Sequence, residues 1–206
     1  MTIETLEKVE TPEIEITDEL RKEVFDKIVV ARVGLLLRHP FFGNMATRLV
    51  IKEASDWCPT AATDGRHLYY SVPFFANMTN KEVEFVIAHE ILHCVFDHMT
   101  RREDRDPQIH NIAADYIVNN TLVRDGIGEK PRDIPIFQDF KYEGWTSEAV
   151  YDEIYKKYGE EELKQLGKIW AIGSIHSNLK SFNSIKNFII KNFNFEDKLI
   201  FLGNVI

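Results

Sequence analysis

Several common features are missing from this sequence, and each absence excludes a class of protein. No apolar run reaches the roughly 18 residues that a membrane-spanning helix needs. The first stretch, MTIETLEKVETPEIEITDEL, is acidic and lacks the apolar core of a secretory signal peptide. The two cysteines, Cys58 and Cys94, are too few for a disulfide framework and fit a reducing compartment. We therefore expect a cytoplasmic protein with no membrane partner, and a loose N-terminal arm over residues 1–16.

Positive charge is also scarce, and it is unevenly distributed. The chain has 25 Lys and Arg against 33 Asp and Glu, a net charge of −8, so nucleic acid is not an expected partner. From Lys164 onward, six lysines face only Glu196 and Asp197, which gives this tail +4 and the rest −12. The shift predicts two domains, a main one over residues 17–160 and an appendage over residues 161–206.

Apolar periodicity and flanking cap or turn residues predict an α+β main domain. The predicted helices cover residues 18–39, 80–98, 108–124 and 147–158, and the predicted strands lie within 47–54 and 67–72. Pro40 is expected to stop the first helix, and a turn at Asp64-Gly65 is expected to lead into the second strand.

The helix predicted over residues 80–98 contains the segment VIAHEILHCVFDH. On a helix, residues i and i+4 lie about 40° apart around the axis, so His89 and His93 project from one face and can chelate one ion. Glu90 then sits beside the open coordination position and can take a proton from metal-bound water. The spacing predicts a Zn²⁺ site that hydrolyses peptide bonds through a zinc-bound water activated by Glu90.

The alternative is an amphipathic core helix whose histidines are simply hydrogen-bonded. That interpretation must account for two His and one Glu within five residues of an otherwise apolar segment. Because burying an unpaired Glu is costly, we favour the metal site.

A third metal ligand is needed, and several residues are candidates. His98 lies about 180° around the helix from His89 and cannot join the same ion if the helix continues, so a structural role, for example a hydrogen bond to a loop, is expected for it instead. In NIAADYIVNN, the residues Asn111, Asp115 and Asn119 form one polar stripe at i, i+4 and i+8 on an apolar helix. We predict Asp115 as the ligand and the two asparagines as its hydrogen-bonding supports.

Two alternatives for this third position stay open. Asp115 could instead form an ordinary ion pair, as buried acids often do with arginine. His110, near the start of the same predicted helix, would then be the next candidate ligand.

Five stretches carry a resemblance to a known family: RHPFFGNM, TAATDGRHLYY, VIAHEILHCVFDH, NIAADYIVNN and GWTSEAVYDEI. Over roughly residues 20–158 the chain resembles metallopeptidase-like proteins that often carry a VWA-like domain behind the peptidase-like domain. The resemblance implies a zincin-like fold, His89 and His93 as ligands, and Glu90 as the catalytic base. It also supports a functional role for Asp115. In zincin-like folds the strand before the active helix borders the cleft, so residues 67–70 would either bind an extended peptide or form an internal strand.

The tail is predicted to form one βαβ unit, with strands near residues 169–172 and in KLIFLGNVI. It resembles the start of calcineurin-like metallophosphoesterases, which bind metals with an Asp-x-His and a Gly-Asp. Here Ser174-Ile-His176 and Gly203-Asn204 stand in their places, so both carboxylates are absent and no phosphoesterase activity is expected. The unit is then a fusion remnant or a docking element for a partner protein.

The sequence leaves two functions open. The first is a zinc peptidase acting on a peptide or protein substrate, with Tyr116 or a nearby arginine as a candidate oxyanion partner. The second is a non-catalytic, zinc-stabilised interaction module, against which the presence of Glu90 argues because a purely structural site needs no base.

Overall fold

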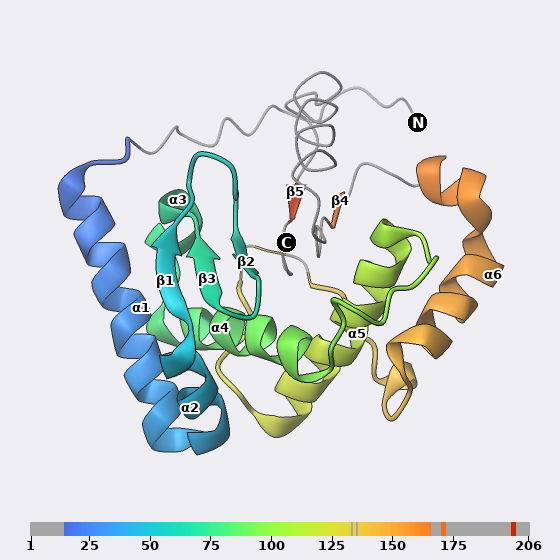
Figure 1. Cartoon of the computed structure of the whole chain (residues 1–206), viewed down its shortest axis with the longest axis horizontal. Helices are drawn as coiled ribbons and strands as arrows, with labels where there is room; N and C mark the ends of the chain where they lie inside the picture. Colours follow the sequence, from blue (N-terminus) through green and yellow to red (C-terminus); the bar gives the residue numbers. More distant parts are fainter. Residues whose placement is uncertain (1–14, 133, 135, 166–169, 172–198, 201–206) are drawn as a thin grey trace, which may run out of the picture.

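The computed structural model describes residues 15–132, 134, 136–165, 170–171 and 199–200. They form a helix-rich α+β structure (Figure 1). The helices are α1 (Asp18–Arg38), α2 (Pro40–Arg48), α3 (Val72–Ala76), α4 (Asn80–Val95), α5 (Pro107–Asp125), α6 (Ser147–Gln165) and the 3-10 turn η1 (Phe140–Tyr142). The strands are β1 (Val50–Glu53), β2 (Ala61–Thr63), β3 (His67–Tyr70), β4 (Trp170–Ala171) and β5 (Leu199–Ile200).

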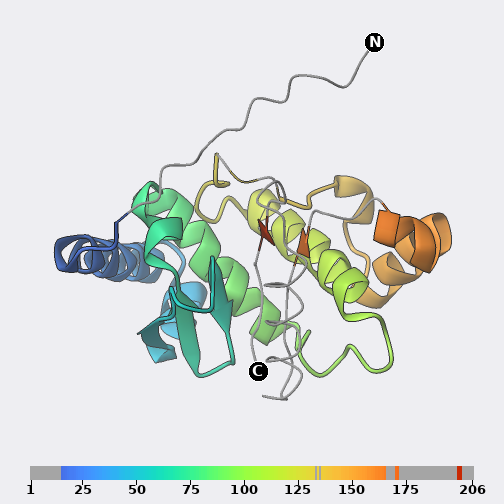
Figure 2. The same cartoon turned by 90° about the horizontal axis from the view of Figure 1, so that it is seen from above.

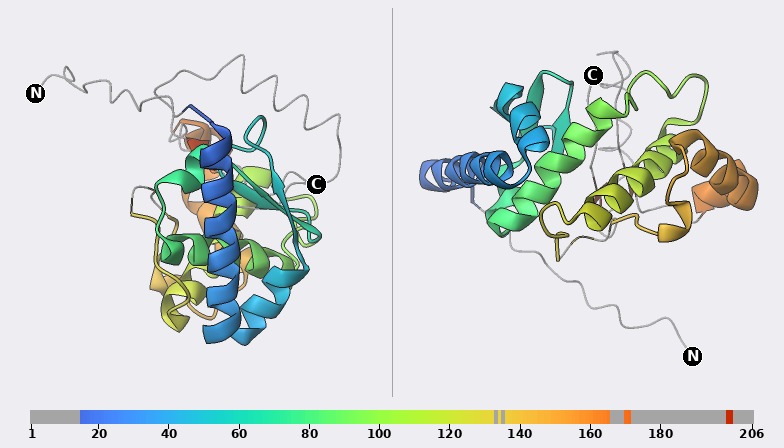
Figure 3. Two further views of the ribbon diagram at one scale, coloured as in Figure 1. Left: turned by 90° about the vertical axis from the view of Figure 1, so that its left-hand side faces the viewer. Right: turned by 90° about the horizontal axis from the view of Figure 1, so that it is seen from below.

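Four helices follow one another across the molecule in the order α1, α4, α5 and α6. Neighbours in this series pack against each other, and the views from above and below show α4 and α5 side by side (Figures 2 and 3). The main apolar core lies where α1, α4 and the sheet meet, and a second cluster joins α5 to α6. None of the helices that the structure describes combines the length and the apolar character required to cross a membrane.

The small sheet has the strand order β1-β3-β2. β1 pairs in parallel with β3, with Val50 opposite His67, and β2 pairs antiparallel with β3, with Ala61 opposite Tyr70. The Asp64 side chain closes the predicted turn by accepting the backbone N–H groups of Arg66 and His67 at 2.8 and 2.5 Å. Because β3 is hydrogen-bonded on both sides, the alternative of an internal strand is correct, and the prediction that residues 67–70 bind an extended peptide is wrong.

The long helices confirm most of the predicted boundaries. Thr17 caps α1 by accepting Leu20 N–H at 3.2 Å, and Asp106 caps α5 by accepting the N–H groups of Gln108 and Ile109. Gly126 ends α5 with a φ of 64°, which glycine adopts without strain. α6 continues to Gln165, beyond the predicted end at residue 158.

Four short elements were not predicted: α2, β2, α3 and η1. Pro40 does end α1, but it also starts α2, because proline at the first helical position has no N–H to leave unpaired. In this segment Phe42 and Ala46 are buried in the main core, so tertiary packing stabilises a helix that local propensity alone does not indicate.

α4 is the central helix, and its N-terminus has the predicted capping box. The Thr79 side chain accepts Glu82 N–H at 3.2 Å, and the Glu82 carboxylate accepts Thr79 N–H at 2.8 Å. Every residue from Glu82 to His93 is buried. The helix ends at Val95 rather than at residue 98, and this difference changes the position of His98.

Both predicted tail strands have short counterparts in the structure. β4 and β5 pair in parallel, with Trp170 opposite Leu199. The predicted helix between them, His176, the Gly203-Asn204 pair and residues 1–14 of the predicted arm lie outside the described residues. The division into domains at residue 160 stays a prediction.

Candidate metal centre

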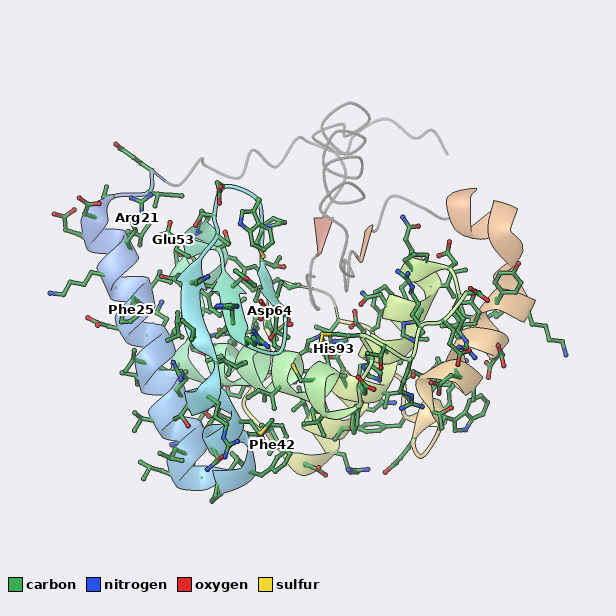
Figure 4. The ribbon with its side chains drawn as sticks, viewed as in Figure 1. Arg21, Phe25, Phe42, Glu53, Asp64 and His93 are labelled. Atoms are coloured by element: carbon green, nitrogen blue, oxygen red, sulfur yellow. The ribbon has the colours of Figure 1, made fainter. Side chains whose placement is uncertain are left out.

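Three of the predicted site residues come together between α4 and α5. His89 and His93 are fully buried on α4, and Asp115 is 2% exposed on α5. One potential ligand atom from each residue lies within 4.8 Å of the others, and this is the cluster that could hold a metal ion among the described residues. Figure 4 labels His93 on α4, where this helix runs beside α5.

The cluster is built around three close contacts. Asp115 Oδ1 lies 3.2 Å from His93 Nε2 and 3.5 Å from His89 Nε2, and the two Nε2 atoms are 2.9 Å apart. Ala113 and Ala114 are both fully buried beside Asp115. Ala113 belongs to the apolar cluster that joins α5 to α6, so Asp115 lies on a helix that is packed on both sides.

The polar stripe predicted on α5 surrounds this cluster. His89 Nδ1 lies 2.9 Å from Asn119 Oδ1, and the Asn119 amide donates to Phe137 O at 2.9 Å, which fixes which end of the amide faces the histidine. On the other side, Asn111 Nδ2 donates to Asp115 Oδ2 at 3.3 Å. Asn111, Asp115 and Asn119 therefore all face the cluster, and each asparagine supports a different candidate ligand.

His98 differs from its prediction, whereas His110 stays apart from the cluster. Because α4 ends early, His98 is 2% exposed and its Nδ1 lies 3.1 Å from Nδ1 of His93. His98 thus contacts a candidate metal ligand, whereas a loop was given as the example of a partner for its structural role. His110 is also buried, with its ring centroid 6.3 Å from that of His98, but it does not belong to the three-residue cluster.

Burial and charge oppose each other within the cluster. Burial acts to lower the pKa of His89, but the hydrogen bond and charge of Asp115 outweigh it and raise this pKa above its usual value. For His93, burial and the neighbouring His89 prevail over Asp115, and the pKa is lowered. Burial also acts to raise the pKa of Asp115, yet its bonds to the two histidines hold it below the usual range. Asp115 is thus a buried carboxylate that stays ionised and requires a cation nearby.

The donor set fits a divalent metal ion. Asn119 accepts from Nδ1 of His89, so the Nε2 lone pair of this ring is left to face Asp115 and His93. Two imidazole nitrogens and one carboxylate oxygen that converge on one point are ligands that zinc and other divalent transition metals accept. A cation at this point would balance the charge of Asp115 without an extra proton on either histidine.

Glu90 is fully buried on α4 between the two histidines in sequence. Burial, followed by the charge of Glu90, raises the pKa of Cys58 to about 12 and that of Cys94 to about 11. Neither cysteine belongs to the three-residue cluster that could hold a metal ion. The Sγ atom of Cys94 lies 3.8 Å from Oγ1 of Thr63 on β2, so this side of α4 faces the sheet.

Tyr116, the candidate oxyanion partner, lies next to Asp115 on α5. Its ring packs edge-on against Tyr142, with centroids 4.9 Å apart, and against Phe137 at 5.5 Å. The structure thus places this tyrosine in the aromatic group that joins α5 to η1.

Comparison with known protein families shows which family the chain belongs to. Searches of curated proteins and of solved structures found no match. A sequence model of the family described as "Putative metallopeptidase domain" matches residues 26–178, a range that contains α4, α5 and the whole His89-His93-Asp115 cluster. Because the match covers more than half of the 206 residues, the chain belongs to this metallopeptidase domain family.

Proposed function

We propose that the protein is a zinc-dependent peptidase in which His89, His93 and Asp115 hold the metal and Glu90 is the general base. The observation that carries this proposal is the buried His-His-Asp cluster, with a buried glutamate next to one of its histidines. Membership of the metallopeptidase domain family supports the same reaction class. Two neutral imidazoles and one carboxylate favour zinc over metals that prefer oxygen ligands alone.

A divalent ion at this cluster would act as a Lewis acid for the carbonyl of the scissile peptide bond. Glu90 takes a proton from the attacking water and later delivers it to the amine of the leaving product. Asn119 and Asn111 keep His89 and Asp115 in the orientation that the reaction needs. The substrate is a peptide or protein, and because the three residues and Glu90 are buried, a local opening must precede its binding.

Peptide hydrolysis by the wild-type protein and by Glu90→Gln tests the proposal. We expect the variant to lose about 10²- to 10⁴-fold in rate, because it lacks the base, and to keep its metal content, because the three ligands are intact. Glu143→Gln, an exposed site, is the matched control and should hydrolyse at the wild-type rate. Metal binding together with equal rates in wild type and Glu90→Gln would contradict catalysis and favour the non-catalytic, zinc-stabilised module.

A further inference from the structure

The C-terminus of α4 has a backbone conformation that turns the chain back over the second histidine of the motif. Asp97 has a φ of 54°, in the left-handed region that few residues other than glycine adopt. The N–H of His98 donates to His93 O at 3.1 Å, and the N–H of Asp97 donates to Cys94 O at 3.2 Å. These two bonds define a Schellman motif, with Asp97 in the position that glycine most often takes.

This turn places the side chain of His98 against His93. The two Nδ1 atoms are 3.1 Å apart, and the ring centroids are 5.1 Å apart at an interplanar angle of 70°. His98 is 2% exposed and also packs beside the Phe96 ring.

The contact makes the arrangement of the two histidines symmetrical. His89 directs Nε2 into the cluster and is held through Nδ1 by Asn119, and His93 directs Nε2 into the cluster and is held through Nδ1 by His98. A histidine that binds a metal through Nε2 carries its proton on Nδ1 and donates it to a fixed acceptor. For His93, the atom placed to take this role is Nδ1 of His98, 3.1 Å away.

We propose that His98 is a positioning residue that accepts the Nδ1–H of His93 and thereby holds the Nε2 lone pair of His93 toward the metal. This inference rests on the proposed metal site, but it does not require that the site be catalytic. It gives the third histidine of VIAHEILHCVFDH a role: the residue five positions after His93 supports a ligand instead of being one. It also gives a reason for the left-handed Asp97, since a continuing helix would carry His98 away from His93.

Two variants of nearly equal shape test the proposal. His98→Asn places a carbonyl oxygen the same number of bonds from the backbone as the histidine Nδ1 atom, so it can still accept from His93. His98→Leu has the same branching without any acceptor. The affinity for Zn²⁺, measured by competition with a chromophoric chelator, should fall about 10- to 100-fold in the Leu variant and remain close to wild type in the Asn variant. The Co²⁺ absorption spectrum should change in the Leu variant alone, because that spectrum reports the ligand geometry.

Other results overturn the proposal. Wild-type affinity in His98→Leu, or equal losses in both variants that follow their metal-free melting temperatures, would leave His98 only a packing role. In the zinc-loaded wild type, ¹⁵N NMR should show a slowly exchanging Nδ1–H on His93, and a rapidly exchanging one would contradict the hydrogen bond even if neither variant folds. If the wild type binds no zinc, the inference and the proposed function both fall. If the affinities behave as expected but Glu90→Gln hydrolyses at the wild-type rate, only the catalytic function falls.

Discussion

The two halves of α4 both bury ionisable side chains, but they satisfy them in different ways. In the N-terminal half, Glu82 and Glu84 are 4% and 2% exposed. Glu82 accepts from the N–H of Thr79 and from the backbone and side chain of Arg132. Glu84 pairs with Arg38 and, at 3.0 Å, with Lys81. In this half, the buried carboxylates are therefore paired with arginine and lysine side chains, which are always positively charged.

The C-terminal half pairs its buried acid with histidines instead. There His89 and His93 contact the carboxylate of Asp115 on α5, and a histidine is positive only when it carries an extra proton. A metal ion can take the place of that proton, whereas nothing needs to replace the arginines and lysine of the first half. The comparison teaches that burial of an acid does not itself indicate a metal site, and that the chemistry of its partners does.

The largest expected effect is the stabilisation of the protein by zinc, which should depend on the C-terminal half of α4 and not on the N-terminal half. Zinc at about 1,000 times its Kd should stabilise the wild type by about 4 kcal/mol, because it binds the folded state. Asp115→Ala should show no such rise in melting temperature, since it lacks one of the three ligands. Glu84→Gln, a change in the first half, should lower the melting temperature without zinc and retain the full rise with zinc. Calorimetry with and without a chelator measures all three proteins.

An unchanged zinc response in Asp115→Ala would place the third ligand elsewhere, and His110 would be the next residue to test. If zinc also failed to raise the melting temperature of Glu84→Gln, the two halves of α4 would not act independently.

The second prediction concerns acid unfolding and belongs to the N-terminal half. Burial acts to raise the pKa of Glu82, but its hydrogen bonds from Thr79 and Arg132 prevail and lower it from 4.5 to about 2. A carboxyl with a depressed pKa stabilises the fold above its unfolded pKa, and this stability is lost as the pH falls through the folded pKa. Between pH 4.5 and 2, the free energy of unfolding should therefore fall less in Glu82→Gln than in the wild type, by up to about 3 kcal/mol.

Urea unfolding of metal-free protein at a series of pH values measures this difference. The exposed Glu143→Gln should follow the wild-type curve. Parallel curves for the wild type and Glu82→Gln would show that the hydrogen bonds of Glu82 do not depress its pKa in the folded protein.

What the sequence predicted correctly depends on local rules. The capping box at Thr79 and the shared face of residues 89 and 93 follow from helix geometry, and the structure has both. The stripe on α5 also follows from the helical repeat, and it pointed to Asp115 without any knowledge of its contact with α4. Each of these features can be predicted from residues that lie no more than eight positions apart in the sequence.

What the sequence did not predict depends on distant contacts or on one backbone angle. The central position of β3 is set by its pairing with β1 and β2, and no local pattern encodes that order. The angle rule placed His98 on the side of the helix opposite His89 because it assumed a helix that continues, and the left-handed Asp97 breaks that assumption. Aspartate can adopt this conformation, but its presence in a sequence does not predict it as a glycine would.

The smallest expected effect tests how tightly the N-terminal half is packed around Glu84. Gly34 of α1 faces the Arg38–Glu84 ion pair, and a Cβ at Gly34 would meet Arg38 Nη2 first and would lie 2.5 Å from Oε1 and 3.2 Å from Cδ of Glu84. In an exposed helix, Gly→Ala stabilises by about 1 kcal/mol. Here Glu84 is held between Arg38 and Lys81 and cannot easily move, so Gly34→Ala should instead destabilise by about 1–2 kcal/mol.

The same substitution in a Glu84→Ala background should have the opposite sign. With the carboxylate removed, the added methyl group meets no fixed atom of Glu84, and the helix propensity of alanine should make Gly34→Ala stabilising by up to about 1 kcal/mol. Arg38 and Lys81 do not oppose this, because they are 45% and 39% exposed and can turn to solvent. Chemical unfolding of the four proteins of this cycle gives the coupling, and zinc affinity should be the same in all of them. A destabilising Gly34→Ala in both backgrounds would show that contacts other than Glu84 require the glycine.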